Sequence, residues 1–411
     1  MRVLLATHAS LEVDSGEERA LEDLGRHLLE RGHEVRFANY EGLLDNQPRK
    51  TLREVREDLG AAEVVSVPAM PLASPFLAIP SPRGLTVLVA SMRWADVIVF
   101  GQFYGFDVTM WALDLVVRRP LLCSQANALF RPFRATVRDA LQEAYERTVG
   151  IALLRRFAAV RVCNSDDLRT LTGRGCRQVL LLYPPNTDLS LSASTARLSD
   201  PDRATVDWLS SDRRFKLLIA GRMTHQKGLD LLGEAILRIG ADDPAVLKEV
   251  VFLFAGTREL PTALHGPAHR YPGLVVNLGV VPREAFPAVV NTVDAVVMPS
   301  RYESFGRVAA EAHSLGKPVV ATNVTGLREV VVSGTTGILV DAWSPEALAA
   351  AVRTLHDTFA HRPEGWKAMQ EAARARFAER FGSPRSTEQM NALVAMLERL
   401  AREPRRSGSP S

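Results

Sequence analysis

The sequence has few cysteines and no long apolar run. Its three cysteines, Cys123, Cys163 and Cys176, form no CxxC pair and have no histidines nearby at metal-ligand spacing. This pattern argues against a disulfide framework and a structural zinc site, and it fits a reducing compartment. No apolar run approaches the roughly 18 residues of a membrane span, and the run at 2–6 is too short for a signal peptide. The sequence therefore predicts a cytoplasmic protein that does not cross a membrane.

The sequence also has little net charge, +3, with 46% hydrophobic and 24% charged residues. These values are typical of a soluble globular protein, and no nucleic-acid motif is present. Basic residues are nevertheless enriched locally, because residues 118–177 contain twelve Arg and Lys against five Asp and Glu. This segment is either a solvated helix face or a surface that approaches an anionic acceptor or the inner face of an anionic membrane.

At 411 residues the chain exceeds the usual size of a single core, which predicts two domains. Apolar runs of strand length alternate with helical patterns along both halves, as in parallel sheets covered by helices. The predicted organisation is, in chain order, a Rossmann-like domain at 1–184, a hinge at 185–214, a second Rossmann-like domain at 215–382, a C-terminal helix at 383–402 and a disordered tail at 403–411.

Two polar or proline-rich segments are predicted to lack regular structure. The prolines between Val64 and Arg83 indicate either a shaped loop over a pocket or a long connection. The sequence Asp200-Pro201-Asp202 has the form DxD but falls in the expected hinge, so it is predicted to be a turn and not a metal site.

Residues 296–322 predict a buried strand, a polar glycine-containing turn, a helix and a second buried strand. Two carboxylates, Glu303 and Glu311, flank the expected helix start. If all eight steps between them were helical, they would lie about 12 Å apart along the axis, which suits an extended ligand with an anionic middle. The alternative is that Glu303 complements the helix dipole and Glu311 is a solvated helix residue.

A second polar loop, Gly221 to Gly228, follows the first predicted strand of the second domain. Since both loops follow parallel strands, they are expected at the same sheet edge. Arg222 offers a planar fork for phosphate oxygens, and Lys227 a compact positive charge. Alone, these two residues would be ordinary surface charges; beside Glu303 they indicate a site for a diphosphate.

These motifs together resemble a known family. The chain carries GRxxxxKG at 221–228, PSxxESFG at 299–306 with seven residues between its two glutamates, GKPVVAT at 316–322, and Thr325-Gly326 followed by Glu329. This order resembles the family-4 retaining glycosyltransferases of GT-B fold. The likeness covers most of 215–345, and extends more weakly to Gly16, to residues 32–35 and to 164–165.

The resemblance implies a GT-B fold, in which two doubly wound α/β domains face a central cleft and the C-terminal helix packs back on the first domain. It implies a retaining hexosyltransferase that moves a sugar from a UDP- or GDP-linked donor to a hydroxyl acceptor, without a cofactor or an obligatory metal ion. The implied site residues are Arg222 and Lys227 at the diphosphate, Glu303 at the transferred sugar, Glu311 at the ribose, the backbone of Phe305, Gly306 and Arg307 at the phosphates, and Gly16 in the N-terminal glycine loop.

The sequence departs from the family in the first domain. Members often have a histidine near the sugar, whereas the corresponding regions here are 101–104 and 124–127 and contain none. Gln125 and Asn127 could hydrogen-bond hydroxyl groups instead. Arg307 is either a further phosphate ligand or an exposed helix residue. The alternatives in function are a GT-B nucleotide-sugar epimerase and a non-catalytic, nucleotide-binding or membrane-associated scaffold.

Overall fold

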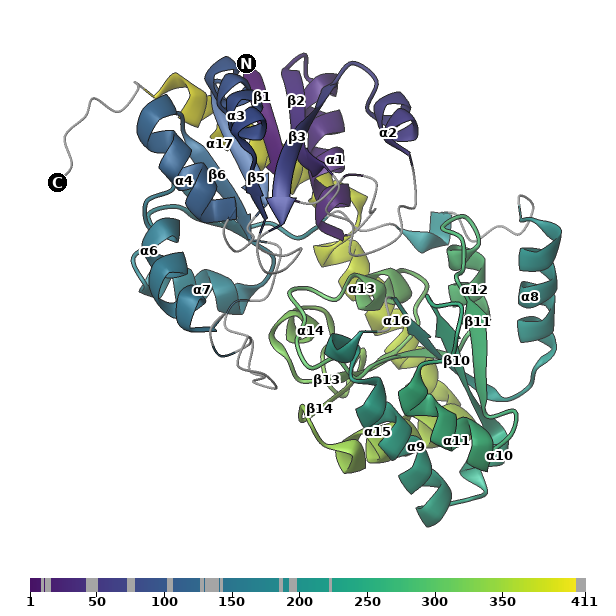
Figure 1. Cartoon of the computed structure of the whole chain (residues 1–411). Coiled ribbons are helices and arrows are strands. Elements are labelled where there is room, and N and C mark those ends of the chain that lie inside the picture. The colour runs from purple at the N-terminus through teal and green to yellow at the C-terminus, as the bar shows by residue number, and fades with distance from the viewer. Residues whose placement is uncertain are drawn as a thin grey trace. The chain divides into compact units, whose positions relative to one another are not determined.

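The computed structural model of the protein describes residues 1–8, 11, 16–41, 51–71, 78–101, 106–125, 129, 140, 143–184, 188–191, 198–221 and 224–403. Two compact units are present (Figure 1). Unit 1 consists of Met1–Pro185 with Thr387–Ser411, and unit 2 of Asn186–Ser386. The expected disordered tail lies, from residue 404 onward, outside the described residues.

Unit 1 contains an eight-stranded sheet in the order β4-β3-β2-β1-β5-β6-β7-β8. The neighbours pair in parallel except β3 and β4, which are antiparallel. The strands are β1 (Arg2–Thr7), β2 (Glu34–Glu41), β3 (Glu63–Pro71), β4 (Ala78–Pro80), β5 (Val97–Gly101), β6 (Leu121–Gln125), β7 (Ala159–Val162) and β8 (Val179–Leu181). The described helices are α1 (Gly16–Glu30), α2 (Leu52–Leu59), α3 (Pro82–Trp94), α4 (Phe106–Val117), the π-helix η2 (Glu146–Gly150), α6 (Ile151–Leu154) and α7 (Ser165–Gly173).

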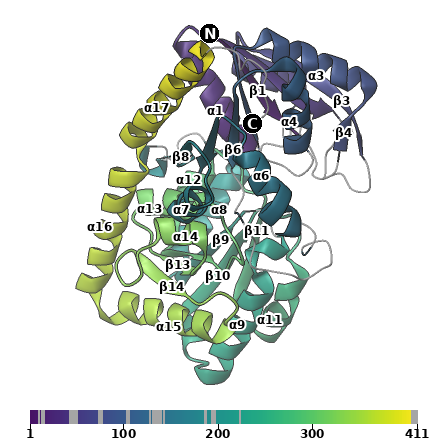
Figure 2. The ribbon, with the colours of Figure 1, turned by 90° about the vertical axis from the view of Figure 1, so that its left-hand side faces the viewer.

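The C-terminal helix α17 (Ser383–Arg402) completes the core of unit 1. Its apolar stripe packs against side chains of α1 and β1, with which it forms one buried cluster that includes Leu393, Leu397, Leu24 and Leu5. Figure 2 shows α17 running alongside α1. The prediction that the last helix returns to the first domain is therefore confirmed.

The proline-rich segment from Val64 to Arg83 is more regular than predicted. Pro68 and Pro71 lie in β3, and Pro80 lies in β4, where it is paired with Ala69. Pro82 is the first residue of α3, which Ser81 caps. Pro80 is tolerated in β4 because this short strand lies at the edge of the sheet. On the side of an edge strand that has no neighbour, the missing N–H group of proline removes no hydrogen bond between strands. Residues 72–77, between the two strands, lie outside the described residues.

Unit 2 contains a six-stranded sheet in the order β11-β10-β9-β12-β13-β14, with parallel neighbours throughout. The strands are β9 (Phe215–Ala220), β10 (Val250–Ala255), β11 (Val275–Gly279), β12 (Ala295–Met298), β13 (Val319–Thr322) and β14 (Gly337–Val340). The helices are η3 (Leu189–Leu191), α8 (Asp200–Ser211), η4 (His225–Lys227), α9 (Leu229–Asp242), α10 (Val246–Glu249), η5 (Thr262–Leu264), α11 (His265–Arg270), α12 (Phe286–Thr292), α13 (Arg307–Ser314), α14 (Thr325–Val330), α15 (Pro345–His361) and α16 (Pro363–Arg380).

The order of the strands in unit 2 reverses between β9 and β12. From β9 the chain proceeds outward through β10 and β11, then returns to β12 on the other side of β9 and proceeds through β13 and β14. In open parallel sheets, ligands bind beyond the carboxyl ends of the strands at such a switch point. A ligand site is therefore expected at the loops that follow β9 and β12.

The segment 185–214, predicted to be a hinge, contains α8, and from Asn186 onward it belongs to unit 2. Asp200-Pro201-Asp202 is the first turn of α8 and not an isolated turn, because the Ser199 Oγ accepts a hydrogen bond from the backbone N–H of Asp202. Val206 and Leu209 of this helix are buried. Ser199 as the N-cap and Pro201 in the first turn explain why a helix begins here.

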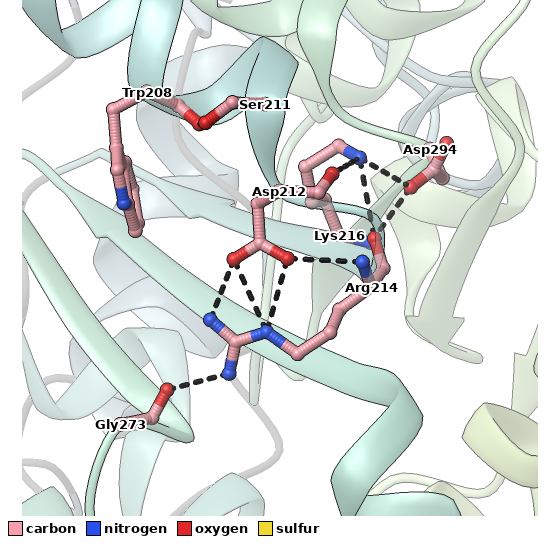
Figure 3. A network of polar contacts seen from close by, with 7 residues as sticks. All are labelled: Trp208, Ser211, Asp212, Arg214, Lys216, Gly273 and Asp294. Atoms are coloured by element: carbon pink, nitrogen blue, oxygen red, sulfur yellow. Dashed lines mark hydrogen bonds and ion pairs between the residues drawn. The ribbon is translucent and has the colours of Figure 1, made fainter.

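An ion-pair network anchors β9 at its amino end, opposite the expected ligand edge (Figure 3). Arg214 donates to both oxygens of the Asp212 carboxylate, and to the carbonyl oxygen of Gly273 at 2.8 Å. Lys216 Nζ lies 3.5 Å from Asp294 Oδ2. The hydrogen bonds from Arg214 hold the pKa of Asp212 below its usual range, although burial opposes them.

The core of unit 2 also contains a neutral histidine on α13. His313 is fully buried, and its Nε2–H donates to the carbonyl oxygen of Thr336 at 3.2 Å. Burial lowers the pKa of His313 from 6.5 to about 3.

We expect His313 to make unfolding sensitive to mild acid. The unfolded chain binds a proton at this residue below about pH 6.5 and the folded chain does not, so stability falls as the pH drops from about 6.5 toward 3. Urea unfolding of the protein and of His313→Gln, which retains a donor for Thr336, measures this contribution. The difference between them should change by about 1.4 kcal/mol per pH unit in that window; parallel pH profiles would contradict the assignment.

Candidate functional site

A buried polar turn follows β12 at the switch point of unit 2. It runs from Ser300 to Gly306 and leads into α13, which begins at Arg307. Gly306 is the N-cap residue and has a φ of 93°, a conformation that glycine adopts without a steric penalty. Phe305 is 2% exposed, and its ring lies edge-on to that of Phe381 with the centroids 5.3 Å apart. The side chain of Phe305 therefore anchors the turn in the core.

Glu303 of this turn forms an ion pair with Lys227 of η4, whose Nζ donates to its Oε1. Glu303 is only 8% exposed, and the Ser300 hydroxyl lies 3.4 Å from the same oxygen. A carboxylate with so little solvent is stabilised by a cation and by hydrogen bonds. The pair joins the loop after β9 to the turn after β12, two loops that the sequence predicted to lie at the same sheet edge.

The same two loops are also joined through their backbones. The N–H of Arg301 donates to the carbonyl oxygen of Gln226 at 2.8 Å, and the Gln226 amide donates to the carbonyl oxygen of Tyr302 at 3.0 Å. Gly228 packs so closely that a Cβ atom would lie 2.0 Å from the Pro299 oxygen. These contacts fix where Lys227 stands relative to Glu303.

A third loop, after β13, supports the turn from α14. The N–H of Gly326 donates to the carbonyl oxygen of Glu303 at 2.9 Å. A Cβ atom on Gly326 would lie 2.3 Å from the backbone nitrogen of Phe305, so the two backbones are in direct contact. This contact explains the glycine of the Thr325-Gly326 motif. Glu329 of the same motif pairs with Arg380 at 3.0 Å, which ties α14 to α16.

The structure brings most of the predicted donor-site residues of unit 2 to one edge. Glu303, Phe305 and Gly306 lie in the turn, Arg307 and Glu311 lie on α13 and are half-buried, and Lys227 reaches Glu303 from η4. The first N–H groups of any α-helix have no acceptor within the helix, and its amino end attracts an anion. Arg222 and Met223 lie outside the described residues. Gly16, in unit 1, is the first residue of α1.

The predicted spacing of the two glutamates needs correction. Because α13 begins at Arg307, only the steps from there to Glu311 are helical, and the separation of about 12 Å for eight helical steps does not apply. The left-handed conformation of Gly306 breaks the helix on its amino side. Glu303 therefore belongs to the turn that precedes the helix and is held by Lys227.

In unit 1, the sequence interpretation passed over His8. This residue directly follows β1, and its ring lies 6.4 Å, between centroids, from that of Phe106, the first residue of α4 after β5. Since β1 and β5 are neighbours at the switch point of this sheet, His8 lies at the edge where a ligand is expected. Its place directly after the first strand was the available signal. Gln125 ends β6 and is buried, whereas residues 102–104 and Asn127 lie outside the described residues.

The described ranges contain no group of three or more His, Cys, Asp or Glu side chains arranged to hold a metal ion. Within the same ranges, no helix is both long and apolar enough to span a bilayer.

Part of the chain matches a known protein family. Residues 214–358 match the profile of the family described as Glycosyl transferases group 1. The D-inositol 3-phosphate glycosyltransferase of Geodermatophilus obscurus is 32% identical over 268 residues, which cover 62% of this chain and 57% of that protein. The glycogen synthase of Mycobacterium tuberculosis is 29% identical over 278 residues, covering 66% and 64%. The chain thus spans less than two thirds of the length of either relative.

Similar solved structures cover nearly the whole chain. Anabaena HepE, in complex with UDP and glucose, superimposes with a TM-score of 0.72 at 20% identity, covering 97% of this chain and 99% of that one. The sucrose-phosphate synthase of Thermosynechococcus elongatus gives 0.74 at 20% identity, covering 97% and 100%.

Two parallel-sheet α/β units with this topology define the GT-B fold, as predicted. Within it, residues 214–358 are the part that matches the Glycosyl transferases group 1 family.

Proposed function

We propose that the protein is a retaining glycosyltransferase that moves a sugar from a nucleoside diphosphate donor to a hydroxyl acceptor. The observation that carries the proposal is the ion pair between Lys227 and Glu303 at the amino end of α13, at the switch point of unit 2. A cation, a buried carboxylate and a helix start suit the phosphates and the sugar hydroxyls of such a donor. The family of residues 214–358 and the complexes of the neighbours with UDP and glucose support it.

The residues divide the donor between them. Lys227 and Arg222 would bind the diphosphate, together with the backbone N–H groups of Phe305 to Arg307. Glu303 would accept hydrogen bonds from the transferred sugar, and Glu311, on the second turn of α13, from the ribose. Gly16, at the start of α1, would let the donor phosphate or the acceptor approach the backbone.

In the proposed reaction the bond between the sugar and the diphosphate breaks while the acceptor oxygen attacks the same face of the sugar. The acceptor proton passes to the departing diphosphate, so no protein base is required. The protein contributes by stabilising the charge that grows on the diphosphate, with Lys227, Arg222 and the amino end of α13 fixed in advance. We propose that these cations suffice and that no divalent ion is obligatory.

Binding of nucleoside diphosphates tests the proposal directly. A ligand that binds only the folded state stabilises it by RT ln(1 + [L]/Kd), which is about 2.7 kcal/mol at a concentration of 100 Kd. We expect UDP or GDP to raise the melting temperature, and uridine or inorganic phosphate alone to raise it far less. Lys367→Ala, at an exposed position on α16, should behave as the unmodified protein. If no nucleotide shifts melting, the proposal is wrong.

Hydrolysis of the donor separates the proposed enzyme from its alternatives. A glycosyltransferase releases free sugar slowly when water replaces the acceptor, whereas an epimerase releases an epimerised product and a scaffold that only binds nucleotides releases nothing. Formation of UDP or GDP without acceptor should therefore accompany binding.

Peripheral contact with an anionic membrane through residues 118–177 stays a proposal, but one arginine of this segment is buried and does not contribute to the surface. Arg155, Arg156 and Arg169 are exposed. Arg161 is 7% exposed and donates to the Ser124 hydroxyl at 3.1 Å.

A further inference from the structure

Trp343 lies in the loop between β14 and α15 in a conformation that its residue type disfavours. Its φ is 81°, in the left-handed region, where a bulky side chain is a genuine outlier. Glycine would adopt this conformation without strain. Strain of this kind persists where surrounding contacts over-determine the structure, and it gathers at functional sites. Contacts of the indole ring are therefore expected to compensate for the strained backbone of Trp343.

The indole ring covers the guanidinium group of Arg301. The Cζ atom of Arg301 lies 4.9 Å from the ring centroid, and Arg301 is 4% exposed although Trp343 is 37% exposed. A desolvated cation over an aromatic face is attracted more strongly than one in water. The ring thus shields the guanidinium from solvent on the side where β14 ends.

Arg301 in turn holds the loop that carries Lys227. Its Nη1 donates to the carbonyl oxygen of His225 at 2.9 Å and to Asp230 Oδ1 at 2.7 Å, while Nη2 pairs with the other oxygen of Asp230. These two acceptors stand at the two ends of the segment His225–Asp230, on either side of Lys227. A fork that binds both ends limits the movement of the lysine between them.

We propose that Trp343 is a positioning residue for the donor site: by stacking on Arg301 it holds the loop 224–230, and so places Lys227 beside Glu303. This inference rests on the proposed function for its effect on donor binding. Its effect on the loop does not depend on that function. Trp343 itself need not touch the donor.

Three variants of the full chain separate positioning from simple stability. Trp343→Phe keeps an aromatic face, Trp343→Ala removes the face and keeps the strain, and Trp343→Gly removes both. Trp208→Ala is the matched control, since Trp208 is 40% exposed and lies on α8 in the same unit. The Gly variant should melt at a higher temperature than the Ala variant, because glycine relieves the backbone strain. If Trp343 had a purely structural role, hydrogen exchange and donor affinity would follow the melting temperature of each variant.

Hydrogen–deuterium exchange gives a readout that requires no ligand. We expect the amides of residues 224–230 and of Arg301 to exchange faster in both Trp343→Ala and Trp343→Gly, while the Phe variant retains their protection. Exchange within β10 should stay unchanged. Unchanged protection of 224–230 in the Ala and Gly variants would overturn the proposal.

Donor affinity gives the second readout. The dissociation constant of the nucleoside diphosphate that binds the unmodified protein should rise about fivefold in the Ala and Gly variants alike, although the Gly variant should melt at a higher temperature than the Ala variant. Recovery of affinity in the Gly variant would overturn the proposal. If no nucleotide binds the unmodified protein, the proposed function fails, and the exchange data still decide whether Trp343 holds the loop.

Discussion

Replacing Lys227 with alanine should lower the rate of donor hydrolysis by about 10²- to 10³-fold, the usual cost of removing one fixed group that stabilises transition-state charge. Lys227 is the described cation that reaches Glu303, and it extends from a loop fixed by backbone contacts to the turn after β12. Its charge would act on the diphosphate most strongly as the bond to the sugar breaks. The measurement is nucleotide release at saturating donor, with the dissociation constant determined separately.

The variant must be separated from a folding defect. Lys227→Ala leaves Glu303 without its cation at a position that is 8% exposed, so a lower melting temperature is expected as well. The double variant Lys227→Met with Glu303→Gln removes both charges and should recover part of that stability, while remaining inactive. Near-normal nucleotide release by a folded Lys227→Ala protein would rule out the proposed role.

Arg222→Ala extends this experiment to the other predicted phosphate ligand. We expect turnover to fall strongly while the fold stays intact, because Arg222 follows Gly221 at the carboxyl end of β9 in the sequence. Unchanged turnover would remove Arg222 from the site and leave the diphosphate to Lys227 and the amino end of α13.

The four central strands of unit 2, β9, β10, β12 and β13, could be predicted from the sequence because they are buried on both faces. Runs such as 250–255 and 295–298 are continuously apolar, and they coincide with β10 and β12. Such a strand can be recognised in the sequence without knowing which strands it pairs with, because burial on both faces makes it continuously apolar. The motif order then placed Lys227 and Glu303 at the same sheet edge, and the structure pairs them there.

The helix α8 and the strands β3 and β4 were not predicted, because serine or proline residues in or next to them are also typical of loops. The segment just before α8 is rich in serine, a composition typical of a linker, although Ser199 and Asp202 have the spacing of a helix start. In β3 and β4 the prolines suggested a loop, because sequence alone does not reveal which strand lies at a sheet edge.

The stacking of Trp343 on Arg301 could not have been predicted from the sequence. The two residues lie 42 positions apart (343 − 301), and their contact depends on the conformations of two loops that follow different strands. In addition, the backbone of Trp343 is in the left-handed region, which tryptophan and other bulky residues disfavour. Tertiary packing overrides the local preference here.

Replacing Gly326 with alanine should cost about 100-fold in donor hydrolysis, although it adds a single methyl group. The new Cβ would lie 2.3 Å from the Phe305 nitrogen, 2.4 Å from the Ser304 carbonyl carbon and 2.7 Å from the Glu303 oxygen. All three are backbone atoms of the turn, so the clash cannot be relieved by a side-chain rotation. The turn must move away from α14, and a displacement of about 1 Å at reacting groups can cost 10²-fold.

The glycine of α11 supplies the matched control. A Cβ atom on Gly266 would meet no atom within 4 Å, so Gly266→Ala should leave hydrolysis and donor affinity unchanged and alter stability by at most about 1 kcal/mol. Gly326→Ala should weaken nucleotide binding as well, because the moved turn carries both Glu303 and the backbone that leads into α13. Circular dichroism and melting of both variants identify any general loss of fold. A folded Gly326→Ala protein with normal nucleotide affinity would show that the turn does not bind the donor.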